Sequence, residues 1–136
     1  MICDKEVHRL QNDRDKFERY FHLLNHWMTA RHHGHSVVDY LLHFGYKRIA
    51  IYGMGYLAAH IIDDIQGSDI EIAYGIDREI CNSNAPLDDI YSPDDSLPVV
   101  DVVIVTPYTS FLEIKNDLSK KMDCPVISLE NVIWSI

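Results

Sequence analysis

The stretch that decides the fold is Arg48-Ile49-Ala50-Ile51-Tyr52-Gly53-Met54-Gly55-Tyr56-Leu57-Ala58. It begins with a short apolar run that ends at a glycine, which is typical of a strand buried on both faces of a parallel sheet. A Gly-x-Gly-x-x-Ala pattern follows directly, and the residues after it, about 56–66, predict a helix that Gly67 ends. The sequence therefore predicts a strand, a tight loop and a helix in direct succession.

The rest of the chain beyond this stretch continues the alternation of strands and helices. Residues 70–76, 99–105 and 126–129 predict further strands, residues 110–121 predict a helix, and residues 89–91 predict a loop or one short edge strand. Strands that alternate with helices favour a parallel sheet with right-handed crossovers. We therefore expect an α/β fold, a small Rossmann-like parallel sheet, over residues 47–136.

Residues 1–46 predict an N-terminal helical extension. From Asp4 to about Ala30 apolar residues recur at three-, four- and seven-residue steps, the pattern of one helical face; they are Val7, Leu10, Phe17, Phe21, Leu24 and Met28. Ser36, with Asp39 three residues later, predicts the capped start of a second helix that runs to about Phe44 and is closed by Gly45.

The second half of the first helix carries a wider apolar surface than packing on one neighbour requires. Tyr20, Leu23 and Trp27 lie beside the stripe of apolar residues and extend it to a second face. This width predicts a homodimer through the N-terminal helix, with Trp27 buried in the interface. The alternative is that Trp27 completes the core of the single chain.

The glycine-rich loop has the chemistry of a phosphate-binding turn. Gly53 would make the tight turn, Gly55 would let the backbone approach a pyrophosphate, and small Ala58 would allow close packing of helix on strand. The N-terminus of the following helix would face the anion. The alternative is that the glycines only make a tight turn. The cofactor-binding residues we predict are Gly53, Met54, Gly55, Tyr56, Leu57, Asp77, Arg78 and Thr106.

Asp77 lies 24 residues after Gly53, at the end of the second predicted strand, where dinucleotide-binding folds place a carboxylate for the ribose. The alternative is an ordinary acid at a strand end. Arg78 is adjacent and could accommodate a 2′-phosphate, so the sequence leaves NAD or NADP open as the cofactor. The hydroxyls of Thr106-Pro107-Tyr108-Thr109-Ser110 could contact a ligand at the end of a central strand, or could simply start and cap the next helix.

Composition excludes several other classes of function. The net charge of −9 disfavours nucleic acid as a partner, and no stretch approaches the length of a membrane span. The first residues lack the layout of a signal peptide, so we expect a cytoplasmic protein. Cys3, Cys81 and Cys124 are scattered, and the eight histidines lack the spacing of a metal site, so we expect reduced thiols and no metal. The paired acids Asp63-Asp64 and Asp88-Asp89 resemble solvated surface acids, and we predict no catalytic residues.

At four places the chain resembles a known group of proteins. Tyr46 to Gly55, the strand end Ile76-Asp77-Arg78, Val103-Ile104-Val105-Thr106 and Cys124 to Glu130 resemble the Rossmann-like nucleotide-binding domains of bacterial polysaccharide biosynthesis. Similar domains occur at the N-termini of nucleotide-sugar epimerases and dehydratases and of sugar O-acetyltransferases. The resemblance implies a site for NAD(P) or a nucleotide sugar at Gly53, Gly55 and Asp77.

The function that we expect from these patterns is a small nucleotide-binding module, accessory to surface-polysaccharide or nucleotide-sugar metabolism. The chain lacks the Tyr-x-x-x-Lys pair of the short-chain sugar epimerases, so we expect no catalytic apparatus of its own. Two alternatives stay open: an NAD(P)-dependent enzyme acting on a nucleotide sugar, and an interaction protein whose Rossmann-like site is empty.

Overall fold

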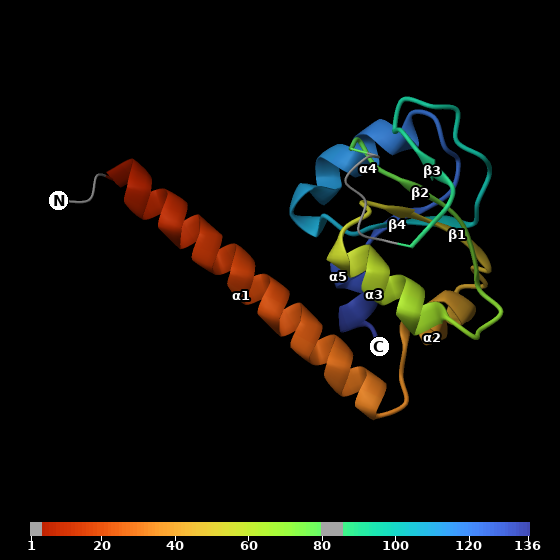
Figure 1. Ribbon diagram of the computed structural model, residues 1–136, viewed down its shortest axis with the longest axis horizontal. Coiled ribbons are helices and arrows are strands. Elements are labelled where there is room, and N and C mark those ends of the chain that lie inside the picture. The colour runs from red at the N-terminus through yellow and green to blue at the C-terminus, as the bar shows by residue number, and fades with distance from the viewer. Residues whose placement is uncertain (1–3, 80–85) are drawn as a thin grey trace.

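The computed structural model describes residues 4–79 and 86–136 of the chain (Figure 1). An entirely helical N-terminal part precedes all of its strands. In chain order the helices and strands are α1 (Asp4–His32), α2 (Val37–His43), β1 (Arg48–Tyr52), α3 (Tyr56–Ile65), β2 (Glu71–Ile76), β3 (Ile90–Tyr91), β4 (Val102–Val105), the 3₁₀ turn η2 (Tyr108–Ser110), α4 (Phe111–Ser119), β5 (Val126–Ser128) and α5 (Leu129–Trp134).

The strands form one parallel five-stranded sheet in the order β3-β2-β1-β4-β5. The predicted α/β class is confirmed, and the short segment β3 is an edge strand paired with β2. The order 3-2-1-4-5 is the one that doubly wound nucleotide-binding folds share up to their fifth strand. Because β1 lies between β2 and β4, the strand order reverses at β1, and the carboxyl ends of β1 and β4 border a crevice where ligands bind in such folds.

Helices cover both faces of the sheet, which explains why β1 is apolar throughout. Ile49 and Ile51 pack in the core formed with α1, α2, α3 and α5, whereas Ala50 and Tyr52 pack in the core under α4. Successive side chains of a strand point to opposite faces, so both sets must be apolar. Figure 1 shows α4 on one side of the sheet and α2, α3 and α5 on the other. The first core includes residues from before and after residue 46, so the N-terminal helices and the sheet share one core.

Helix α1 packs on the domain with a different face from the one that its apolar stripe suggested. Leu23 is fully buried and Trp27 is 5% exposed, both in the core with α3 and β1. The expectation that Trp27 is held by a second subunit is therefore wrong, because this side chain completes the core of its own chain. The regular apolar stripe instead stays uncovered: Phe17 is 73% exposed and Phe21 64%.

The carboxylate of Asp64 joins the three helices α1, α2 and α3. One oxygen, Oδ2, accepts hydrogen bonds from Val37 N at 2.8 Å and from Trp27 Nε1 at 3.3 Å. The other, Oδ1, forms an ion pair with Arg31 Nε at 2.9 Å, and the side chain is only 3% exposed. The sequence-based interpretation of Asp64 as a solvated acid is therefore wrong, whereas its neighbour Asp63 is exposed.

Capping residues in the sequence determine where the smaller helices begin. Ser36 caps α2 by accepting from Val38 N, and Asp39 completes the predicted capping box by accepting from Ser36 N. Helix α5 was missed by the sequence analysis, although Ser128 caps it by accepting a hydrogen bond from Glu130 N. The apolar spacing of Leu129, Val132 and Ile133 would have completed that signal.

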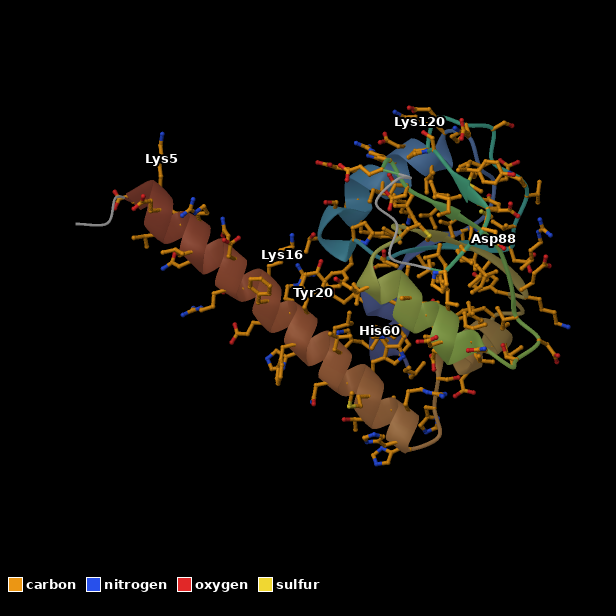
Figure 2. The ribbon with its side chains drawn as sticks, viewed as in Figure 1. Lys5, Lys16, Tyr20, His60, Asp88 and Lys120 are labelled. Atoms are coloured by element: carbon orange, nitrogen blue, oxygen red, sulfur yellow. The ribbon has the colours of Figure 1, made fainter. Side chains whose placement is uncertain are left out.

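The first half of α1 projects away from the domain (Figure 1). Residues 4–19 are all exposed, and the first bond to the domain is the ion pair of Arg19 with Glu130, in which Nη2 donates to both carboxylate oxygens, at 2.9 and 3.1 Å. In Figure 2, Lys5 lies on the projecting part and Tyr20 lies where the helix meets the domain. Within residues 4–79 and 86–136, no helix combines the length and apolar character needed to cross a bilayer. Cys124 is a free thiol, while Cys3 and Cys81 lie outside the described residues.

We expect Asp64→Ala to lower the free energy of unfolding by about 2–3 kcal/mol, because two N–H donors lose a charged, buried acceptor. Asp63→Ala is the matched control and should change it by less than about 0.5 kcal/mol, since that side chain is exposed. Urea unfolding followed by circular dichroism measures both values. Equal effects of the two substitutions would show that Asp64 does not hold the helices together.

Candidate functional site

The glycine-rich loop continues directly from β1 and is held from both sides. Gly53 N donates to Ile76 O of β2 at 2.7 Å, and Thr106 N donates to Tyr52 O at 3.0 Å. Gly53 has a φ of +90°, a conformation that L side chains rarely adopt, and a Cβ at this position would collide with Thr106 Oγ1. Gly53 thus makes the tight turn that the sequence predicted, pressed against the chain that follows β4.

Asp77 supports this loop from the end of β2. Its Oδ2 accepts a hydrogen bond from Met54 N at 2.8 Å, and its Oδ1 accepts one from Glu79 N at 2.8 Å. Each carboxylate oxygen has a further lone pair, so the group can still accept a hydrogen bond from a ligand hydroxyl. Asp77 therefore has a structural task that its spacing from Gly53 did not reveal.

Thr106 supports the loop from the end of β4. Its hydroxyl donates to Tyr52 O at 2.8 Å and lies 3.2 Å from Gly53 O, and the residue is only 4% exposed. The hydroxyl hydrogen is thus engaged within the protein. Of the other hydroxyls in this loop, Ser110 stands at the start of α4 and makes no side-chain cap to the helix.

Met54 contributes its backbone, not its side chain, to the surface of the loop. The side chain is 1% exposed and lies against Gly75, where an added Cβ would collide with the sulfur. Glycine at position 75 therefore makes room for Met54 beneath the loop. The sequence analysis did not identify this pair, because the two residues are far apart along the chain.

Gly55 is the open point of the loop. A Cβ added there would meet no heavy atom within 4 Å, so the space in front of it is unfilled. Gly55 is also the N-cap of α3, with no side-chain cap and no acidic residue in the first helical turn. The first N–H groups of a helix lack intrahelical partners and carry partial positive charge. This helix end therefore has the geometry that binds an anion in other proteins.

A cavity of about 730 Å³ lies over the loop. All eight residues that the sequence singled out line it, so the fold brings the ends of β1, β2 and β4 together as predicted. The sequence analysis missed the contributions of α1 and α4. Phe17, Tyr20 and Leu24 of α1 form one wall, and Ser110, Glu113 and Ile114 come from the chain at α4.

Charges around the cavity are mostly negative. Among residues 4–79 and 86–136, the charged side chains that line it are Asp77, Glu79 and Glu113 and one cation, Arg78. The hydrogen bond with Tyr52 raises the pKa of Arg78, and the guanidinium lies 3.8 Å from Asp117 of α4. Arg78 is thus directed toward the α4 side of the sheet, where its two partners lie.

Behind the α1 wall lies a buried aromatic contact. The ring of Tyr108 packs on Tyr20, with ring centroids 5.3 Å apart, and the guanidinium of Arg19 lies 5.1 Å from the Tyr108 centroid. Burial raises the pKa of Tyr108 to about 12, so its phenol stays protonated at neutral pH. This contact fixes the part of α1 that faces the cavity.

The residues that could hold a metal do not assemble. Among residues 4–79 and 86–136, no three side chains of His, Cys, Asp or Glu come together at a distance suited to a metal ion. His26, one of the eight histidines of the chain, packs its ring on Trp134, and its Nε2 lies 3.3 Å from Ile136 O.

We expect Gly53→Ala to cost at least about 2 kcal/mol more stability than Gly67→Ala, measured by urea unfolding. Both glycines have a positive φ, +90° and +83°, so both substitutions carry backbone strain of similar size. Only Gly53 is crowded, by Thr106 and Pro107, whereas nothing lies within 4 Å of a Cβ at Gly67. Equal losses of stability for the two substitutions would contradict the close packing of Gly53 against Thr106 and Pro107.

A scan against protein-family models and searches of curated proteins and of solved structures found no match to this chain.

Proposed function

We propose that the chain is a small module that binds a phosphate-containing nucleotide, NAD(P) or a nucleotide sugar, in the cavity over Gly53-Met54-Gly55, without a catalytic apparatus of its own. The observation that carries the proposal is the unfilled space at Gly55, directly in front of the uncapped start of α3. A backbone that keeps this space open at a helix N-terminus suits a pyrophosphate. The resemblance to domains of polysaccharide biosynthesis supports an accessory role in nucleotide-sugar metabolism, and the proposal keeps the cytoplasmic location that the sequence predicted.

The shape and chemistry of the cavity support a nucleotide over a small inorganic anion. Its volume of about 730 Å³ falls within the range of roughly 300–1,000 Å³ typical of small-molecule sites. Apolar and aromatic side chains of α1, Phe17, Tyr20 and Leu24, lie across from the loop. Such a wall offers a surface for a base or another flat group, while the loop holds the phosphates.

The second candidate is an interaction protein whose loop holds no ligand. The bonds within the site favour it, because Asp77 and the Thr106 hydroxyl are already engaged in supporting the loop. Its working surface would be α1. We propose, in either case, that the protein is a homodimer held together by α1, since this helix presents apolar side chains that its own domain does not cover.

A thermal-shift screen against NAD, NADP, CoA, UDP-sugars and CDP-sugars identifies the ligand, because a compound that binds only the folded state raises its stability. Gly55→Val should then lower the affinity for that ligand at least about tenfold in calorimetry, since the side chain would occupy the space of the pyrophosphate. The variant should stay folded, because a φ of −95° and a ψ of −156° suit valine.

Gly55→Ala is the graded control, since it adds one carbon at the same point and should weaken binding less. Unchanged affinity of a folded Gly55→Val chain would exclude the proposed site. The absence of any stabilising compound in the screen would favour the interaction protein.

Among dinucleotides we expect a preference for NAD over NADP of about tenfold or more. The Asp77 carboxylate would repel a 2′-phosphate, and Arg78 is engaged with Tyr52 and Asp117 on the α4 side. Asp77→Ala should weaken the binding of both dinucleotides, because the loop loses the hydrogen bond from Met54 N to this carboxylate. It should also reduce the preference for NAD over NADP, because the charge that repels the 2′-phosphate is removed. Arg78→Ala serves as the comparison and should leave the affinity for NAD within about threefold. If the wild type binds NADP more tightly than NAD, Asp77 and Arg78 have the opposite roles in the choice of cofactor.

A further inference from the structure

We infer that the second copy packs on α1 in parallel and in register, along a continuous seam of the helix. The seam consists of positions 7, 10, 14, 17, 21, 24 and 28, which alternate in steps of three and four residues. Its members are Val7, Leu10, Arg14, Phe17, Phe21, Leu24 and Met28. The inference rests on the homodimer proposed above. Phe17 and Leu24 belong both to the seam and to the cavity wall, so the second copy would pack beside the cavity.

The spacing of the seam is that of a coiled coil. A strict alternation of three and four gives a period of 3.5 residues, which keeps a narrow row of side chains facing a partner helix. Over this length a helix that packs only on a globular core usually shows a broader stripe with a period of 3.6. In α1 the broader contact exists separately, through Leu23, Trp27 and Ala30, so the seam serves a different neighbour.

No part of the described chain covers the seam. Its six apolar members expose between 37% and 73% of their surface. Covering these side chains on two copies removes roughly 1,000 Å² or more from water, which reaches the size expected of a specific interface. The first half of the seam lies on residues 4–19, which are all exposed on the part of α1 that projects from the domain (Figure 1).

The match of the seam with itself favours the parallel, in-register pairing. Arg14 is the one charged member, and Asp13 and Glu18 occupy the flanking g and e positions when Val7 is assigned to position a. In register, the two Arg14 side chains meet at one level, where they offset the repulsion between Asp13 of each copy and Glu18 of the other. Every apolar member then meets its own counterpart.

In antiparallel pairings the residues of the seam match one another less well. A pairing that overlaps the whole seam sets Arg14 against Leu24 of the other copy and Val7 against Arg31. A pairing shifted by one heptad sets Arg14 against Phe17 of the other copy. Both arrangements therefore place a charge against an apolar side chain.

The mass of the chain in solution tests the dimer. The wild type should have twice the mass of the 15.8 kDa chain in light scattering at tens of micromolar concentration. Phe21→Glu places a charge in the seam and should give a folded monomer. Asn12→Glu introduces the same residue at an exposed position on the far side of the helix and should stay dimeric.

Phe21 does not line the cavity, so its substitution separates dimerisation from ligand binding. A monomeric wild type would overturn the homodimer and leave the seam to a different helical partner. A Phe21→Glu chain that stays dimeric would place the interface elsewhere.

Spin labels test the orientation independently. With Cys3, Cys81 and Cys124 replaced by serine, a label at Lys5→Cys on the outward side of α1 reports the distance between the two copies. Parallel helices hold these labels roughly 20–30 Å apart, the width of a helix pair with its labels. The antiparallel pairing over the whole seam would offset them by roughly 40 Å along the axis. A dimer with the long distance would overturn the parallel arrangement and leave the homodimer standing.

Discussion

The buried carboxylate of Asp64 joins three of the helices on one side of the sheet, α1, α2 and α3. It fixes α1 through Trp27 and Arg31 and fixes the start of α2 through Val37 N. An acid can be buried in this way only when its oxygens are paired, and here three different groups satisfy them. Because α1 is held at this point, Phe17, Tyr20 and Leu24 reach the cavity wall, while Phe21 and Met28 of the seam stay exposed. The geometry of the site and of the exposed helix face thus follows from one polar junction.

Much of the fold could be predicted because its signals are local. The apolar run of β1, the glycines of the loop and the capping box of Ser36 and Asp39 each specify a structure within a few residues. The errors concern packing between distant segments. A helix with two apolar faces does not reveal which face its own domain covers, so Trp27 was assigned to the wrong neighbour. Asp64 looked like a surface acid, since its partners come from other elements of the fold.

The candidate site likewise has features that the sequence predicts and features that it does not. Its location could be predicted, because the carboxyl ends of parallel strands meet at one edge of the sheet. The hydrogen bonds and contacts of its side chains could not be predicted. Asp77 and Thr106 hold the loop by bonds that depend on register between strands, and the wall formed by α1 depends on a helix docked from outside the sheet.

The contact between Met54 and Gly75 has a consequence for how this sequence can change over evolutionary time. The Met54 side chain occupies the space that any larger residue at position 75 would need. The two positions should therefore covary among homologues: a side chain at 75 requires a smaller one at 54, and a long one at 54 requires glycine at 75. Since Met54 also supplies the N–H that Asp77 accepts, such a paired exchange would leave the backbone of the loop intact while replacing the packing beneath it.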